Sequence, residues 1–108
     1  MENDKKNNQE MPKIEVYIDI EEFAKAGKPH PPGHNKYLIK IDKALYKVEE
    51  ECLTGREILK LAEKNPEKFQ LNMKVKGGVK PIAPDVKVCF SEPGIERFMT
   101  IPLDQTEG

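Results

Sequence analysis

Histidine and cysteine are the residues of this sequence that most often bind metals or act as nucleophiles. His30 and His34 lie in the segment HPPGH, but no further ligands are spaced nearby, so we expect solvated linker histidines and no metal site. Cys52 follows the acidic run 49–51, and negative neighbours disfavour a reactive thiolate. Cys89 lies between two apolar residues, which predicts a buried or half-buried side chain. Neither a CxxC spacing nor a secretion signal is present, so we expect two reduced thiols.

The glycine pair Gly77-Gly78 is the remaining segment that could bind a ligand through its backbone. A phosphate-binding loop needs lysine and then serine or threonine directly after its last glycine. The sequence continues with Val79-Lys80 instead, so we expect a hairpin turn. No acid–base pair, nucleophile or metal-ligand set converges in the sequence, which predicts that the chain is not an enzyme and binds no cofactor.

The C-terminal segment LDQTEG ends in Gly108, whose carboxylate is a further reactive group. Glycine loses more backbone freedom on ordering than any other residue, so it contributes little to a fold. Its lack of a Cβ atom leaves its carbonyl carbon accessible to an attacking group. The four residues before it are polar and should keep the tail solvated and extended: Asp104, Gln105, Thr106 and Glu107.

Length and composition limit what kind of protein this is. The 108 residues allow one domain with tails, and 18 basic residues are mixed with 19 acidic ones to give a net charge of −1. Because no basic stripe is present, binding to nucleic acid has little support. No apolar run is long enough to span a bilayer and no signal peptide is present, so we expect a cytoplasmic protein without a membrane partner.

The elements that must position these groups follow from periodicity and turn residues. Residues 1–12 are polar and are expected to be disordered. Alternation predicts a strand over 13–20, with a short helix at 21–25 that ends at Gly27 and a proline-rich linker up to residue 35. A compact domain should follow, with strands at 36–42, 45–50, 69–75, 86–90 and 95–103, and an irregular connection at 76–85.

One helix is expected between the second and third strands of this domain. Thr54 and Glu57 are spaced as a capping box at its start, and Asn65-Pro66 should end it. The order strand, strand, helix and three strands predicts an α+β protein with a β-grasp fold, in which one helix packs across a mixed sheet. The first and last strands of the domain should then be central neighbours. Alternation leaves open which side chains around Phe98 and Ile101 face the helix.

The domain resembles the bacterial multiubiquitin family of ubiquitin-like proteins. The resemblance rests on KYLIKIDKALYKVEE, LTGREILKLAEKNPEKFQL, KGGVKPI and above all PGIERFMTIPLDQTEG. Together with the patterns above, it divides the chain into four parts: a disordered tail (1–12), an N-terminal strand, short helix and linker (13–35), a ubiquitin-like β-grasp domain (36–103) and a flexible conjugation tail (104–108). The sequence departs from the family in having a single β-grasp pattern, and from ubiquitin in ending with Glu107-Gly108.

The resemblance implies a protein modifier that acts through Gly108. An activating enzyme would use ATP to adenylate the glycine carboxylate, and a conjugating enzyme would transfer it to a target protein, for example as an isopeptide bond. A peptidase like a deubiquitinase would be a further partner. Residues 104–107 would be recognised by these enzymes, and no trimming would be needed to expose Gly108. A thiocarboxylate-forming sulfur carrier is a weaker alternative, because such proteins usually end in two glycines.

The strand expected at 13–20 suggests a different function. Its apolar side chains alternate at Ile14, Val16, Ile18 and Ile20, and such a strand is not stable alone in water. It should therefore add to a sheet edge, either of its own chain or of another molecule. The alternative to a modifier is thus a β-grasp interaction module that is not conjugated and self-associates through this strand into a homo-oligomer. A third possibility is that the strand orders only on an enzyme partner.

Overall fold

The computed structural model of this protein describes residues 17–30 and 36–103. The predictions for residues 1–12, for the N-terminal part of the 13–20 strand, for part of the proline-rich linker and for the tail at 104–108 lie outside these residues. The described elements are β2 (Ile18–Asp19), α1 (Ile20–Ala26), β3 (Tyr37–Ile41), β4 (Ala44–Val48), β5 (Cys52–Thr54), α2 (Gly55–Leu61), β6 (Phe69–Val75), β7 (Gly78–Ile82), β8 (Lys87–Cys89) and β9 (Ile95–Pro102).

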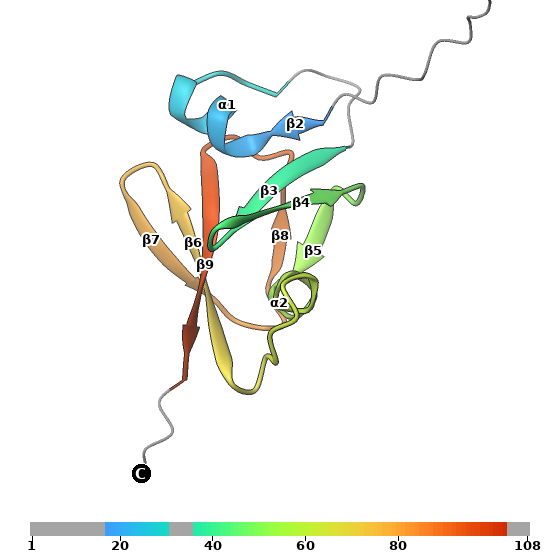
Figure 1. Cartoon of the computed structure of the whole chain (residues 1–108). Coiled ribbons are helices and arrows are strands. Elements are labelled where there is room, and N and C mark those ends of the chain that lie inside the picture. The colour runs from blue at the N-terminus through green and yellow to red at the C-terminus, as the bar shows by residue number, and fades with distance from the viewer. Residues whose placement is uncertain (1–16, 31–35, 104–108) are drawn as a thin grey trace, which may run out of the picture.

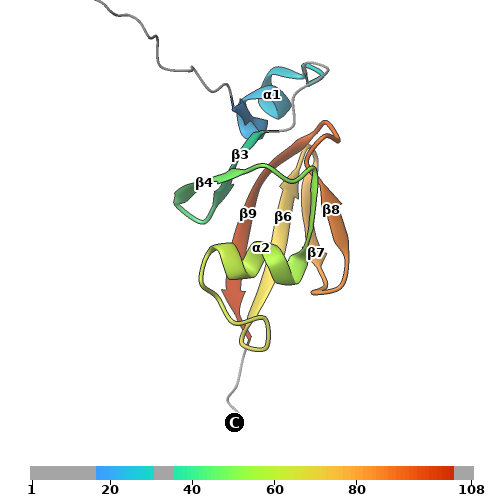
Figure 2. The ribbon, with the colours of Figure 1, turned by 90° about the vertical axis from the view of Figure 1, so that its right-hand side faces the viewer.

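The main sheet has the order β2-β3-β9-β6-β7, and β4 also pairs with β3. The first and last strands of the domain, β3 and β9, are parallel neighbours that meet at Ile41 and Phe98. The helix α2 crosses one face of β9 and β6 (Figure 2). This is the mixed α+β arrangement of a β-grasp fold, so the predicted fold class is confirmed.

Two strands of the domain were not predicted. β7 occupies Gly78–Ile82, where an irregular connection was expected, and pairs with β6 along five register positions from Gly78 to Ile82. Pro81 weakens the strand signal, but a proline is tolerated at a sheet edge. The three-residue strand β5 pairs with β8 in a separate two-stranded sheet and is too short to show a period of its own (Figure 1).

The start of α2 agrees with the prediction, whereas its end does not. The Thr54 hydroxyl accepts a hydrogen bond from the Glu57 amide, and the Glu57 carboxylate accepts one from the Thr54 amide. Both halves of the capping box are therefore formed. The helix ends at Leu61, before the predicted stop at Asn65-Pro66, because the chain turns at Glu63 with a positive φ of 59°.

The N-terminal segment packs against the domain through β2 and α1 (Figure 1). The predicted strand ends early, because Asp19 caps a helix that begins at Ile20. Its carboxylate accepts hydrogen bonds from the amides of Glu21 and Glu22, which satisfies two of the unpaired donors at a helix start. The helix ends as predicted at Gly27, which adopts the left-handed conformation with φ 69°.

A single apolar core joins these parts. It contains residues from β2 and α1 together with residues from the sheet and α2, including Ile18, Ile20, Ile39, Ile58 and Phe98. The two helices within the described residues are both short, and in that part of the chain no helix is long and apolar enough to cross a membrane.

Candidate functional site

The last strand delivers the chain to the start of the C-terminal tail. Pro102 is the final residue of β9 and lies opposite Phe69 of β6. One residue further, the Leu103 amide donates a hydrogen bond of 2.8 Å to the Lys68 carbonyl. The sheet therefore holds the backbone up to Leu103. The predicted site residues Asp104, Gln105, Thr106, Glu107 and Gly108 follow directly but lie outside the described part of the chain.

An apolar cleft of about 410 Å³ lies beside this point. Leu103 lines it together with Leu59 of α2, Phe69 and Leu71 of β6, and Ile82 of β7. Three prolines, at positions 66, 81 and 84, complete much of its wall. Alternation had not indicated this cleft, because it forms only where α2, β6 and β7 come together.

The pairing of β6 with β9 settles which side chains of the last strand face the helix. Phe98 lies opposite Met73 and is fully buried in the core. Side chains alternate along a strand, so Met99 and Ile101 lie on the other face. Ile101 is 46% exposed and Leu103 37% exposed. The sheet therefore presents apolar side chains to solvent close to the start of the tail.

The residues of the predicted self-association strand fall into two groups. Ile18 lies opposite Tyr37 in a parallel pairing of β2 with β3 of the same chain. Ile20 belongs to α1 rather than to a strand and is fully buried. Ile14 and Val16 lie outside the described residues. The two described members of the set are thus part of the chain's own core.

An ion pair fixes α1 against the last strand. The Glu21 carboxylate lies 3.1 Å from both the Lys25 ammonium and the Arg97 guanidinium. Burial would by itself raise the pKa of Glu21, but the hydrogen bond and charge of Lys25, with the charges of Lys40 and Arg97, bring it below its usual value. The Glu21 side chain is only 14% exposed, so this contact is better shielded from water than a surface ion pair.

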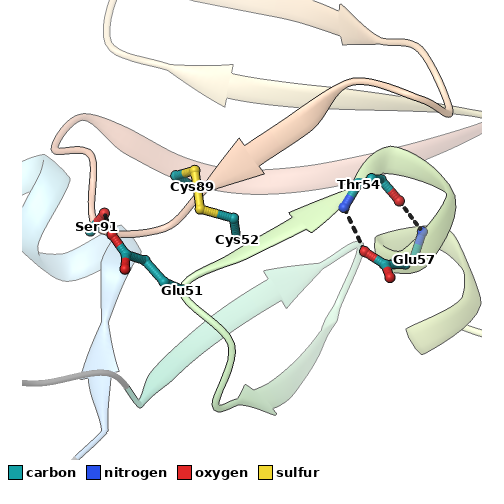
Figure 3. The surroundings of a disulfide bond; sticks show 6 residues. All are labelled: Glu51, Cys52, Thr54, Glu57, Cys89 and Ser91. Atoms are coloured by element: carbon teal, nitrogen blue, oxygen red, sulfur yellow. Dashed lines mark hydrogen bonds between the residues drawn. A yellow bond between two sulfur atoms is a disulfide. The ribbon is translucent and has the colours of Figure 1, made fainter.

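The two cysteines are not the reduced thiols that the sequence suggested. They form the disulfide Cys52–Cys89, drawn in Figure 3. The antiparallel pairing of β5 with β8 places the two residues directly opposite each other, with Cα atoms 4.0 Å apart. Spacing in the sequence could not reveal this, because 37 positions separate the two cysteines and only the register of the two strands brings them together.

His30 is not the solvated linker histidine that was expected. Its ring packs edge-on against Phe23 of α1 at 5.7 Å and lies 6.2 Å from Tyr37 of β3. Burial lowers the pKa of His30, while a backbone hydrogen bond with Ser91 opposes this shift. Nδ1 is buried, and among the described residues it has no hydrogen-bond partner. His34 lies outside the described part.

Residues that could bind a metal do not gather within the described ranges. Over residues 17–30 and 36–103, no group of three or more histidine, cysteine or acidic side chains is placed to hold an ion. Both cysteines are in any case joined to each other.

Comparison with known proteins identifies a family for the domain. The family model described as multiubiquitin matches residues 37–102, from the first residue of β3 to the last residue of β9. No match to the chain was found among curated proteins or among solved structures. The matched region covers more than half of the sequence and coincides with the β-grasp body, so this chain belongs to the multiubiquitin family.

Proposed function

We propose that this protein is a ubiquitin-like modifier that becomes attached to target proteins through the carboxylate of Gly108. The observation that supports the proposal most is the family match over residues 37–102, which ends where β9 ends. A rigid sheet thus precedes a short polar segment that terminates in glycine. In this proposal the chain is a substrate of other enzymes in the cytoplasm, and it has no catalytic site or bound cofactor of its own.

The chemistry follows from the groups that the tail offers. ATP-dependent adenylation would turn the Gly108 carboxylate into a good electrophile with AMP as the leaving group. A nucleophile of the conjugating enzyme would take the acyl group, and a target amine would then receive it and form an isopeptide bond. A glycine without Cβ lets each nucleophile approach the carbonyl carbon. The side chains of residues 104–107 would give the enzymes acidic and amide groups to recognise.

The proposal can be tested by intact mass spectrometry with the activating and conjugating enzymes encoded beside the gene. With ATP, we expect an adduct whose mass is the sum of both proteins less one water, with the junction at Gly108. A chain lacking Gly108 should give no adduct. Gly78→Ala serves as a matched glycine control, because no atom lies within 4 Å of the position of the added Cβ. Equal adduct from wild type and the shortened chain would refute the proposal.

The second candidate function is the unconjugated module that self-associates through its N-terminal strand. The burial of Ile18 and Ile20 in the chain's own core leaves Ile14 and Val16 as the residues that could serve another copy. Light scattering of the full chain and of Ile14→Ser/Val16→Ser would test this. A larger mass for wild type than for the variant supports self-association, and equal monomer masses argue against it.

A further inference from the structure

The Cys52–Cys89 disulfide lies at the end of β8, just before the turn whose residues Pro93 and Gly94 line a pocket together with Phe23 and Ala24 of α1. The N-terminal extension is defined here as β2 and α1 (18–26). The disulfide joins β5 to β8, and the chain leaves β8 towards Ser91, next to α1 (Figure 3). Both cysteines are only partly buried. Neither the family match nor the proposed conjugation at Gly108 uses this pair.

A continuous line of rings connects the disulfide strand to α1. Phe90 follows Cys89 and lies 5.9 Å from the ring of Tyr37. Tyr37 lies 6.2 Å from His30, and His30 lies 5.7 Å from Phe23 of α1. Aromatic pairs at these distances contribute beyond their buried area. A shift of the Phe90 ring would therefore be passed through Tyr37 to the packing of His30 and Phe23.

Hydrogen bonds follow the same route. The Phe90 amide donates to the Glu51 carbonyl at 2.8 Å, and the Ser91 hydroxyl donates to the Glu51 carboxylate at 2.7 Å. The backbone of Ser91 also acts on His30, because it opposes the lowering of the His30 pKa. Glu51 directly precedes Cys52 in the sequence, and Ser91 lies two residues after Cys89. The disulfide thus joins Cys52 to the 89–91 segment, from which the line of rings leads to His30.

The extension covers a part of the sheet that would otherwise be an edge. β2 pairs with Tyr37 and Leu38 of β3, and Glu21 of α1 pairs with Arg97 of β9. An unpaired strand edge of this kind accepts another strand. Loosening of the extension would therefore expose backbone groups of β3 to solvent or to a partner.

We propose that the Cys52–Cys89 disulfide is a redox-sensitive latch that holds the N-terminal extension on the sheet. A dithiol reductant opens it: one thiolate attacks a cysteine sulfur, the S–S bond breaks and a mixed disulfide forms. The other cysteine leaves as a thiolate in this first step. The second thiol of the reductant then attacks the reductant sulfur of the mixed disulfide, which releases the attacked cysteine and closes the reductant into a cyclic disulfide. Two electrons pass to the protein, and both cysteines end as thiols. Without the bond, the 89–91 segment no longer holds His30 in place, and the extension opens more often.

Amide hydrogen exchange measured by NMR, with and without dithiothreitol, tests the latch on the full chain. The probes are the amides of α1 and of the Gly27 cap, with those of Leu71 and Asn72 in β6 as reporters of global opening. We expect the α1 amides to exchange about tenfold faster or more after reduction through a local opening, and to remain faster than Leu71 and Asn72, whose own acceleration reports the separate loss of global stability. Cys52→Ser/Cys89→Ser should show the same α1 rates without reductant and should not respond to it.

Two variants separate the latch from a general loss of stability. Leu59→Ala lowers global stability through a core residue away from the ring line, and in its oxidised form the α1 amides should keep their wild-type rates. In His30→Ala, reduction should accelerate amide exchange in α1 by about threefold at most, because the line of rings through His30 is already interrupted. His34→Ala should respond like wild type. The latch proposal is refuted if reduction does not speed amide exchange in α1. It is also refuted if oxidised Leu59→Ala shows the same faster exchange, or if reduction speeds exchange in His30→Ala as much as in wild type.

Discussion

Replacing Cys52 and Cys89 together by serine should lower the free energy of unfolding by about 4 kcal/mol, because the disulfide closes a loop across a sequence separation of 37. The cross-link restricts the unfolded chain, and this entropic contribution grows with the logarithm of the loop length. Small domains have a total stability of only about 5–15 kcal/mol. The disulfide would therefore account for a large share of the stability of this chain.

Urea unfolding followed by circular dichroism measures the effect directly. With a denaturant dependence of about 1.5 kcal/mol per molar urea, the loss corresponds to a midpoint shift of about 2.7 M. Wild type in dithiothreitol should unfold at the midpoint of the serine variant, and the variant should not respond to the reductant. The slope should rise slightly when the cross-link is absent, because the unfolded chain then exposes more surface.

Two results would contradict the stabilising role of the disulfide. One is a serine variant within about 0.5 kcal/mol of wild type, since surface changes away from special features have effects of that size. The other is the titration of two free thiols in wild type that has been unfolded without reductant. Either result would mean that the strand pairing of β5 and β8, and not the cross-link, carries the stability of this region.

Three further predictions concern single residues. Thr54→Ala should cost about 1 kcal/mol in urea unfolding, because it removes the cap from α2. Gly55→Ala should destabilise by about 1–3 kcal/mol, because the added Cβ would meet a backbone carbonyl oxygen at 2.6 Å, whereas Gly78→Ala should unfold like wild type. The folded-state pKa of His30 is lowered, so at pH values between the folded-state and unfolded-state pKa the unfolded chain binds more protons than the folded chain. The free energy of unfolding should therefore be highest above about pH 6.5 and fall as the pH drops from there through the folded-state pKa. His30→Phe should remove this dependence and His34→Phe should leave it, as measured by thermal unfolding over this pH range.

Local signals predicted the elements that depend on neighbouring residues. The spacing of Thr54 and Glu57 predicted the start of α2, because both hydrogen bonds of a capping box join residues three positions apart. Gly27 marked the end of α1 for a similar reason, since glycine adopts the left-handed backbone that the cap requires. The strand Phe69–Val75 coincides with its predicted bounds, because its alternation and its flanking turns agree.

At other positions the prediction relied on the wrong local signal. Alternation continued through Ile20, but Asp19 and the two acidic residues after it favour a helix start, and the cap prevailed. That signal was present in the sequence and could have been recognised. The hairpin turn expected at Gly77-Gly78 was a signal for β7, and it forms with a φ of 93° at Gly77. The strand after it was nevertheless missed, because Pro81 weakens the strand pattern.

The α+β class, the order of most strands, the capped helix and the family resemblance could be read from the sequence, because they depend on spacing within short windows. The fold was needed to reveal the Cys52–Cys89 disulfide, the packing of the half-buried His30 between Phe23 and Tyr37, and the cleft beside Leu103. Each of these brings together residues from distant elements. Their contacts are set by the register and packing of whole strands, which no local pattern encodes.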